Sequence, residues 1–68
     1  MARRRPKQVR NGTKALCGLL EFIHDVNVEE ARAAVKAGDE AAAKEAAATA
    51  EKARKDGLSW GCSWAERA

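Results

Sequence analysis

The sequence is poor in the large side chains from which cores and reaction centres are built. Its 68 residues include no tyrosine, one phenylalanine, two tryptophans and one histidine. No apolar run approaches the roughly 20 residues that span a membrane, and the stretch 15–20 lacks the flanks and cleavage pattern of a secretory signal. We therefore expect a cytoplasmic protein without a membrane segment, in which Cys17 and Cys62 are reduced thiols.

Alanine takes the place of the missing large residues. The chain has 16 alanines, whereas leucine, isoleucine, valine and phenylalanine together number ten. Ordering the backbone costs about 1–2 kcal/mol per residue, and alanine burial offsets little of this cost. The composition therefore predicts one small domain that is marginally stable without a partner, a covalent bridge or strong helix formation.

Positive charge is concentrated at the start of the chain. The first fourteen residues carry six cations and no acid, whereas the rest carries seven cations and ten acids. Because Pro6, Asn11 and Gly12 disfavour regular structure, we expect residues 1–12 to form an irregular, flexible basic arm. No aromatic side chain is interleaved with the cations, so the pattern favours phosphate contact over base stacking. The candidate phosphate-contacting residues are Arg3, Arg4, Arg5, Lys7, Arg10 and Lys14.

A first helix is predicted over residues 14–37, with Thr13 as its N-cap. Asn27, followed three residues later by Glu30, is typical of a capping box and predicts a break near residue 27. The apolar side chains of this segment follow helical spacing and should supply most of the core. They are Leu16, Leu20 and Ile23, widened by Ala15, Leu19, Phe22 and Val26.

A second helix is predicted over residues 40–56, after a tight turn at Gly38 and Asp39. Gly38 suits a left-handed C-cap, Asp39 suits an N-cap, and Gly57 is the expected C-cap of the second helix. One side of this helix is almost entirely alanine, and we expect it to lie against the first helix. The predicted fold is all-α, with residues 13–68 forming a helical hairpin, or three helices if the first is broken.

Two local resemblances support the helical reading. The run Glu-Ala-Ala-Ala-Lys-Glu-Ala-Ala-Ala at 40–48 resembles the helical spacer repeat of engineered fusions, which implies strong helicity. The run Ala-Val-Lys-Ala-Gly-Asp-Glu-Ala-Ala-Ala-Lys at 34–44 is similar to the hairpin turn in a helical ribosomal RNA-binding protein of the bacterial small subunit. That family's long basic helices are missing here, so only the hairpin is inferred.

The short tail over residues 58–68 carries Trp60 and Trp64, two of the three aromatic side chains. They either close the core or form exposed anchors for a protein partner. The hairpin brings Cys62 to the same end as Cys17. On the first helix, Glu21, Asp25 and Glu29 form an acidic side that is either a solvated face or a docking surface for a basic partner.

The inventory of reactive residues argues against an enzyme. Cys17 and His24 lie about 10 Å apart on a helix, which is beyond hydrogen-bond reach for a nucleophile and its base. Together with Cys62 they lack the short paired spacings of zinc sites. We expect no catalytic residues, no metal, no cofactor and no small-molecule substrate.

Two functions remain open on the sequence. The first is a non-enzymatic accessory protein of a nucleic-acid or nucleoprotein system, with the arm on phosphates and the helical body on protein. The second is a protein–protein interaction module without nucleic-acid binding. That module would be a small phage-type inhibitor of the anti-CRISPR or antitoxin kind, or a homodimeric bundle.

Overall fold

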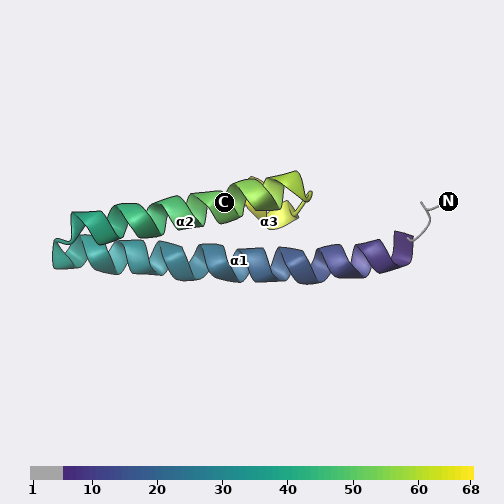
Figure 1. Cartoon of the computed structure of the whole chain (residues 1–68), viewed down its shortest axis with the longest axis horizontal. Helices are drawn as coiled ribbons and strands as arrows, with labels where there is room; N and C mark the ends of the chain where they lie inside the picture. The colour runs from purple at the N-terminus through teal and green to yellow at the C-terminus, as the bar shows by residue number, and fades with distance from the viewer. Residues whose placement is uncertain (1–5) are drawn as a thin grey trace.

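A computed structural model describes the backbone of residues 6–68 and the side chains from Lys14 onward. This part of the chain forms α1 (Pro6–Ala37), α2 (Glu40–Ser59) and the short α3 (Ser63–Arg67), and it contains no strand. The helices α1 and α2 lie antiparallel and side by side, and α3 folds back at the far end of α2 (Figure 1). The predicted all-α class is confirmed. None of these helices is both long and apolar enough to cross a membrane.

The helix α1 begins much earlier than the sequence suggested. It starts at Pro6, so the prediction of an irregular arm is wrong for residues 6–12, and Thr13 is an interior residue instead of an N-cap. Proline is well tolerated in the first turn of a helix, where its missing N–H would have no partner in any case. One glycine and one asparagine then cost at most about 1 kcal/mol each in the helix interior. Residues 1–5, including Arg3, Arg4 and Arg5, lie outside the described residues.

The helix α1 also continues without a break through Asn27. The side-chain Nδ2 of Asn27 donates to the carbonyl oxygen of Ile23, one turn earlier, at 2.8 Å. The amide is thus satisfied within the helix and does not cap a new one. The predicted break near residue 27 is wrong, and the arrangement is a hairpin of two long helices with a third short one.

The turn between α1 and α2 is formed as predicted. Gly38 has a φ of 79°, its N–H donates to the carbonyl of Val35 at 3.0 Å, and the N–H of Asp39 donates to the carbonyl of Ala34 at 2.9 Å. These two bonds are those of a Schellman motif. The side chain of Asp39 then accepts from the N–H of Ala42 at 3.1 Å and caps α2. Because both caps fall on adjacent residues, the chain reverses with no intervening loop.

The end of α2 differs from the prediction, because the helix runs through Gly57 to Ser59. The left-handed residue is Gly61, with a φ of 75°, and the N–H of Cys62 donates to the carbonyl of Gly57 at 2.8 Å. Gly57 serves close packing instead. A Cβ at that position would lie 2.9 Å from Cζ2 of Trp64 and 3.0 Å from Cβ of Ala65.

The alanine side of α2 lies against α1, as the sequence predicted. Ala46, Ala50 and Ala53 are buried along it, and α1 meets them with its own inward side. The larger buried side chains gather at the α3 end, where Leu20, Cys62, Trp64 and Ala65 form a cluster against which Leu16 and Cys17 pack. The core is therefore thin along the hairpin and thickest where three helices meet.

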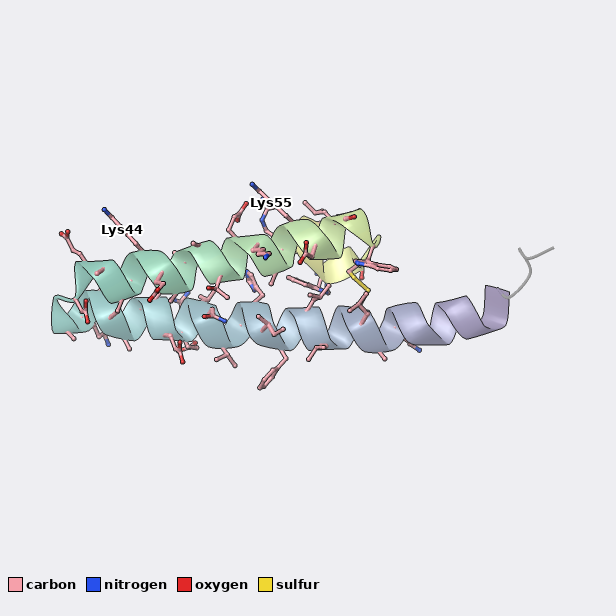
Figure 2. The ribbon with its side chains drawn as sticks, in the orientation of Figure 1. Lys44 and Lys55 are labelled. Carbon is pink, nitrogen blue, oxygen red and sulfur yellow. A yellow bond between two sulfur atoms is a disulfide. The ribbon has the colours of Figure 1, made fainter. Side chains whose placement is uncertain are left out.

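A disulfide joins α1 to the segment before α3. Cys17 and Cys62 are bonded, with their Cα atoms 5.5 Å apart (Figure 2). The prediction of two reduced thiols is therefore wrong for this structure. That prediction rested on the expected compartment, whereas the hairpin and the turn at Gly61 bring the two residues within bonding distance.

Candidate functional site

The side chains capable of chemistry are engaged in structural contacts. Cys17 and Cys62 are used by the disulfide, so neither is a thiolate nucleophile or a metal ligand in this state. Nδ1 of His24 lies 3.0 Å from Oδ1 of Asp25, and the His24 ring centroid lies 5.2 Å from that of Trp64. Between residues 6 and 68, no three histidine, cysteine or acidic residues are grouped to hold a metal ion. The charged and apolar surfaces of α1 and α2 offer further candidates.

The projecting end of α1 carries three of the six basic residues, at positions 7, 10 and 14. In Figure 1 the first turns of α1 extend past α2 and α3, with no other helix beside them. Helical spacing places positions 7, 10 and 14 on one side of α1, and Lys14 is exposed. Three of the six predicted phosphate-contacting residues therefore lie on a helix, and two of them, at positions 7 and 10, were expected in the irregular arm.

The predicted acidic residues continue along that side of α1. Glu21, Asp25 and Glu29 are all exposed. Positions 14, 21 and 25 are separated by seven and four residues, so they lie in one row, with Glu29 at its edge. Nη1 of Arg32 lies 3.8 Å from Oε2 of Glu29, a long contact between exposed groups that neutralises the row weakly. One side of α1 thus changes from basic to acidic along its length.

The two tryptophans have opposite environments. Trp64 is 7% exposed, and its indole Nε1 donates to the carbonyl oxygen of Cys17 at 3.0 Å. Trp64 therefore closes the core and is not accessible to a protein partner. Trp60 is 54% exposed and, of the two, is the one available for contact.

An exposed apolar stripe on α1 is the feature that the sequence interpretation missed. Its residues, Ala15, Leu19, Phe22 and Val26, were assigned to the core but are all exposed, the last three at 55%, 65% and 38%. The buried side of α1 instead runs through Cys17, Leu20 and the half-buried His24. The signal was present, because the apolar residues of this segment cover more of the helix circumference than one neighbouring helix can bury.

The outer side of α2 is charged and solvated. Lys44 and Lys55 point away from α1 (Figure 2). Arg54 donates to Glu51 through Nη2 at 2.6 Å and through Nε at 3.0 Å. This hydrogen-bonded pair lowers the pKa of Glu51 and raises the pKa of Arg54. The pair lies within one helix and supports α2 without forming a site.

The fold is thus a hairpin with a projecting basic end, an acidic middle and an uncovered apolar stripe on a single helix. No family model, curated protein or solved structure matches the chain.

Proposed function

We propose that the protein is a non-enzymatic helical binding protein of a nucleic-acid or nucleoprotein system. In this proposal the six basic residues between positions 3 and 14 contact phosphates, and the hairpin contacts protein. The observation that carries the proposal is the charge partition on α1. Six cations and no acid precede residue 15, and the end of α1 that carries three of these cations projects beyond the hairpin (Figure 1).

Helical geometry makes this segment suited to a phosphate chain. A helix holds cations three and four residues apart on one side, so positions 7, 10 and 14 can follow one strand without first ordering the backbone. Contacts of this kind position a protein on nucleic acid and carry no base specificity. We therefore expect binding that depends strongly on salt and weakly on sequence.

The test compares two triple variants that remove equal charge. K7Q/R10Q/K14Q neutralises the projecting end of α1, whereas K44Q/K52Q/K55Q neutralises exposed lysines of α2. Duplex titrations of the intact chain at several salt concentrations should give a log–log slope steeper than about −4. The α1 variant should reduce the steepness of this slope by about 3, and the α2 variant should leave it nearly unchanged.

Two results would overturn the proposal. One is duplex binding that survives deletion of residues 2–10 unchanged. The other is an equal loss in both triple variants, since that would trace the binding to net charge and not to the α1 segment.

A second candidate function is a protein-interaction module, such as a small phage-type inhibitor. The exposed Leu19, Phe22 and Val26, with Trp60 elsewhere on the surface, favour it. This function would be supported by a purified target that binds the intact protein and the chain lacking residues 2–10 equally. The same target should not bind the Phe22→Ser variant. Loss of target binding on deleting residues 2–10 would favour the first function.

The cytoplasmic location stays a prediction. Disulfides are rare in the cytosol and persist in oxidising compartments, so the redox state of Cys17 and Cys62 in producing cells bears on it directly. Acid quenching followed by thiol alkylation should label both cysteines if the protein resides in a reducing cytosol. Absence of labelling would indicate an oxidising location.

A further inference from the structure

The exposed apolar stripe of α1 consists of Ala15, Leu19, Phe22 and Val26. These residues are separated by four, three and four residues, the spacing of a helix–helix seam. All four are exposed, because α2 covers the opposite side of α1. The spacing and length of the stripe match a second helix lying along α1 over about three turns.

The surroundings of the stripe define two different flanks. On one flank lie the charged Lys14, Asp25 and Glu29, all exposed. On the other lie Leu16 and Ile23, which are only half-buried by the hairpin. The surface that a second helix would cover is therefore apolar in its centre and charged along one edge, which is the usual anatomy of an interface.

We infer that a second copy of this chain covers the stripe, with the two α1 helices antiparallel around a two-fold axis. In the register that buries the whole stripe, Leu19 lies opposite Phe22 of the second copy, and Ala15 lies opposite Val26. Both copies use the same residues, so the contact closes on itself and gives a dimer. This inference does not depend on nucleic-acid binding.

Charge complementarity selects the second copy and its direction. In the antiparallel register Lys14 lies level with position 27 of the second copy, about 3 Å along the axis from both Asp25 and Glu29. These residues share one flank of the stripe, so each Lys14 faces two carboxylates, and the contact occurs twice in the dimer. A parallel two-fold pair would instead place this charged flank against the Leu16 and Ile23 flank of the second copy, which leaves Lys14, Asp25 and Glu29 without opposite charges.

The dimer should be weak, because three helical turns cover less surface than a standard stable interface. We expect a dissociation constant in the micromolar range. The average mass should therefore rise with concentration when sedimentation is measured from about 1 μM to about 1 mM at low salt, without nucleic acid.

The apolar part of the inference is tested by Phe22→Ser, with Val35→Ser as its matched control. Both residues are exposed on α1, at 65% and 67%, but Val35 lies off the stripe. Phe22→Ser should weaken the dimer by at least about tenfold, and Val35→Ser should leave it unchanged. Circular dichroism should show unchanged helicity in both variants, since neither residue belongs to the core.

The antiparallel direction of the two α1 helices is tested by reversing charges in the sequence, so that both copies carry the change. Lys14→Glu should weaken the dimer by roughly threefold to tenfold, and K14E/D25K/E29K should restore it. A parallel dimer would respond to neither change, because its charged flank would face the Leu16 and Ile23 flank of the second copy and form no ion pair across the seam.

Three outcomes would overturn the inference. They are a monomer across the whole concentration range, a dimer insensitive to Phe22→Ser, and a dimer whose affinity the Lys14→Glu change does not lower. A monomer at all concentrations would mean that the stripe is covered by something other than a second copy of this chain.

Discussion

The two ends of the hairpin are stabilised differently, although the same two helices form both. At the α3 end, Leu20 and Trp64 are buried and a disulfide closes the contact. At the turn end, alanines line α2 and Val35 is 67% exposed. Alanine lets two helices approach closely, but large side chains are buried only where a third element covers them. Stability should therefore be concentrated at the α3 end.

Removal of the disulfide should have the largest effect on the stability of the α3 end. C17S/C62S should lower the free energy of unfolding by about 4 kcal/mol, because the bridge closes a loop between residues 45 positions apart. Urea denaturation followed by circular dichroism measures the change. Reductant should destabilise the original protein equally and leave the variant unaffected. Equal stability of the two proteins would show that noncovalent packing alone holds the α3 end.

Two glycine substitutions should have opposite signs. Gly57→Ala introduces a Cβ 2.9 Å from the Trp64 ring and should destabilise by about 1–3 kcal/mol. Gly18→Ala meets nothing within 4 Å on the exposed side of α1 and should stabilise by up to about 1 kcal/mol through helix propensity. Thermal unfolding checks both. Stabilisation by both changes would mean that α3 does not pack tightly on α2.

At the turn end, the cap of α2 is the most sensitive contact. Asp39→Ala removes the side-chain acceptor for the N–H of Ala42 and should destabilise by about 1 kcal/mol. Asp39→Asn, which keeps an acceptor oxygen, should recover most of this loss. Urea denaturation at neutral pH gives the comparison. If the two variants are equally destabilised, the cap contributes through charge and not through its hydrogen bond.

The smallest effect should come from the exposed pair of Glu51 and Arg54 on α2. Because the pair lowers the pKa of Glu51 below its ordinary value of 4.5, its contribution is present above that pH. It is lost as the pH falls through the lowered pKa. Glu51→Gln should therefore make the free energy of unfolding fall slightly less steeply with decreasing pH below pH 4.5. Above pH 4.5 the pH dependence should barely change. A loss of stability in Glu51→Gln that is larger below pH 4.5 than at neutral pH would contradict this assignment.

Much of the fold could be predicted because its signals are local. Gly38 and Asp39 were assigned to their caps correctly, since each role depends on the residue's own backbone preference or short side chain. The helix 40–56 followed from propensity and was extended only at its end. The start of α1 was missed because Asn11 and Gly12 disfavour a helix locally without preventing one.

The candidate surfaces were harder to predict, because they depend on which side of α1 is covered. Leu19 and Leu20 are adjacent and chemically equal, yet Leu20 is 8% exposed and Leu19 is 55% exposed. Gly57 was predicted to end α2, whereas the helix runs to Ser59 and the left-handed glycine is Gly61. The packing role of Gly57 depends on Trp64, because the Trp64 ring occupies the space that a side chain at position 57 would need.

By itself, the sequence determined the helical class, the reversal at Gly38, the alanine side of α2 and the charge partition along the chain. Each of these follows from a residue's own conformational preference or from its spacing to near neighbours. Tertiary structure alone decided that Trp64 is buried, that Cys17 meets Cys62 and that Leu19, Phe22 and Val26 remain uncovered. These features depend on residues far apart in the chain, because one neighbouring helix can bury only one side of α1.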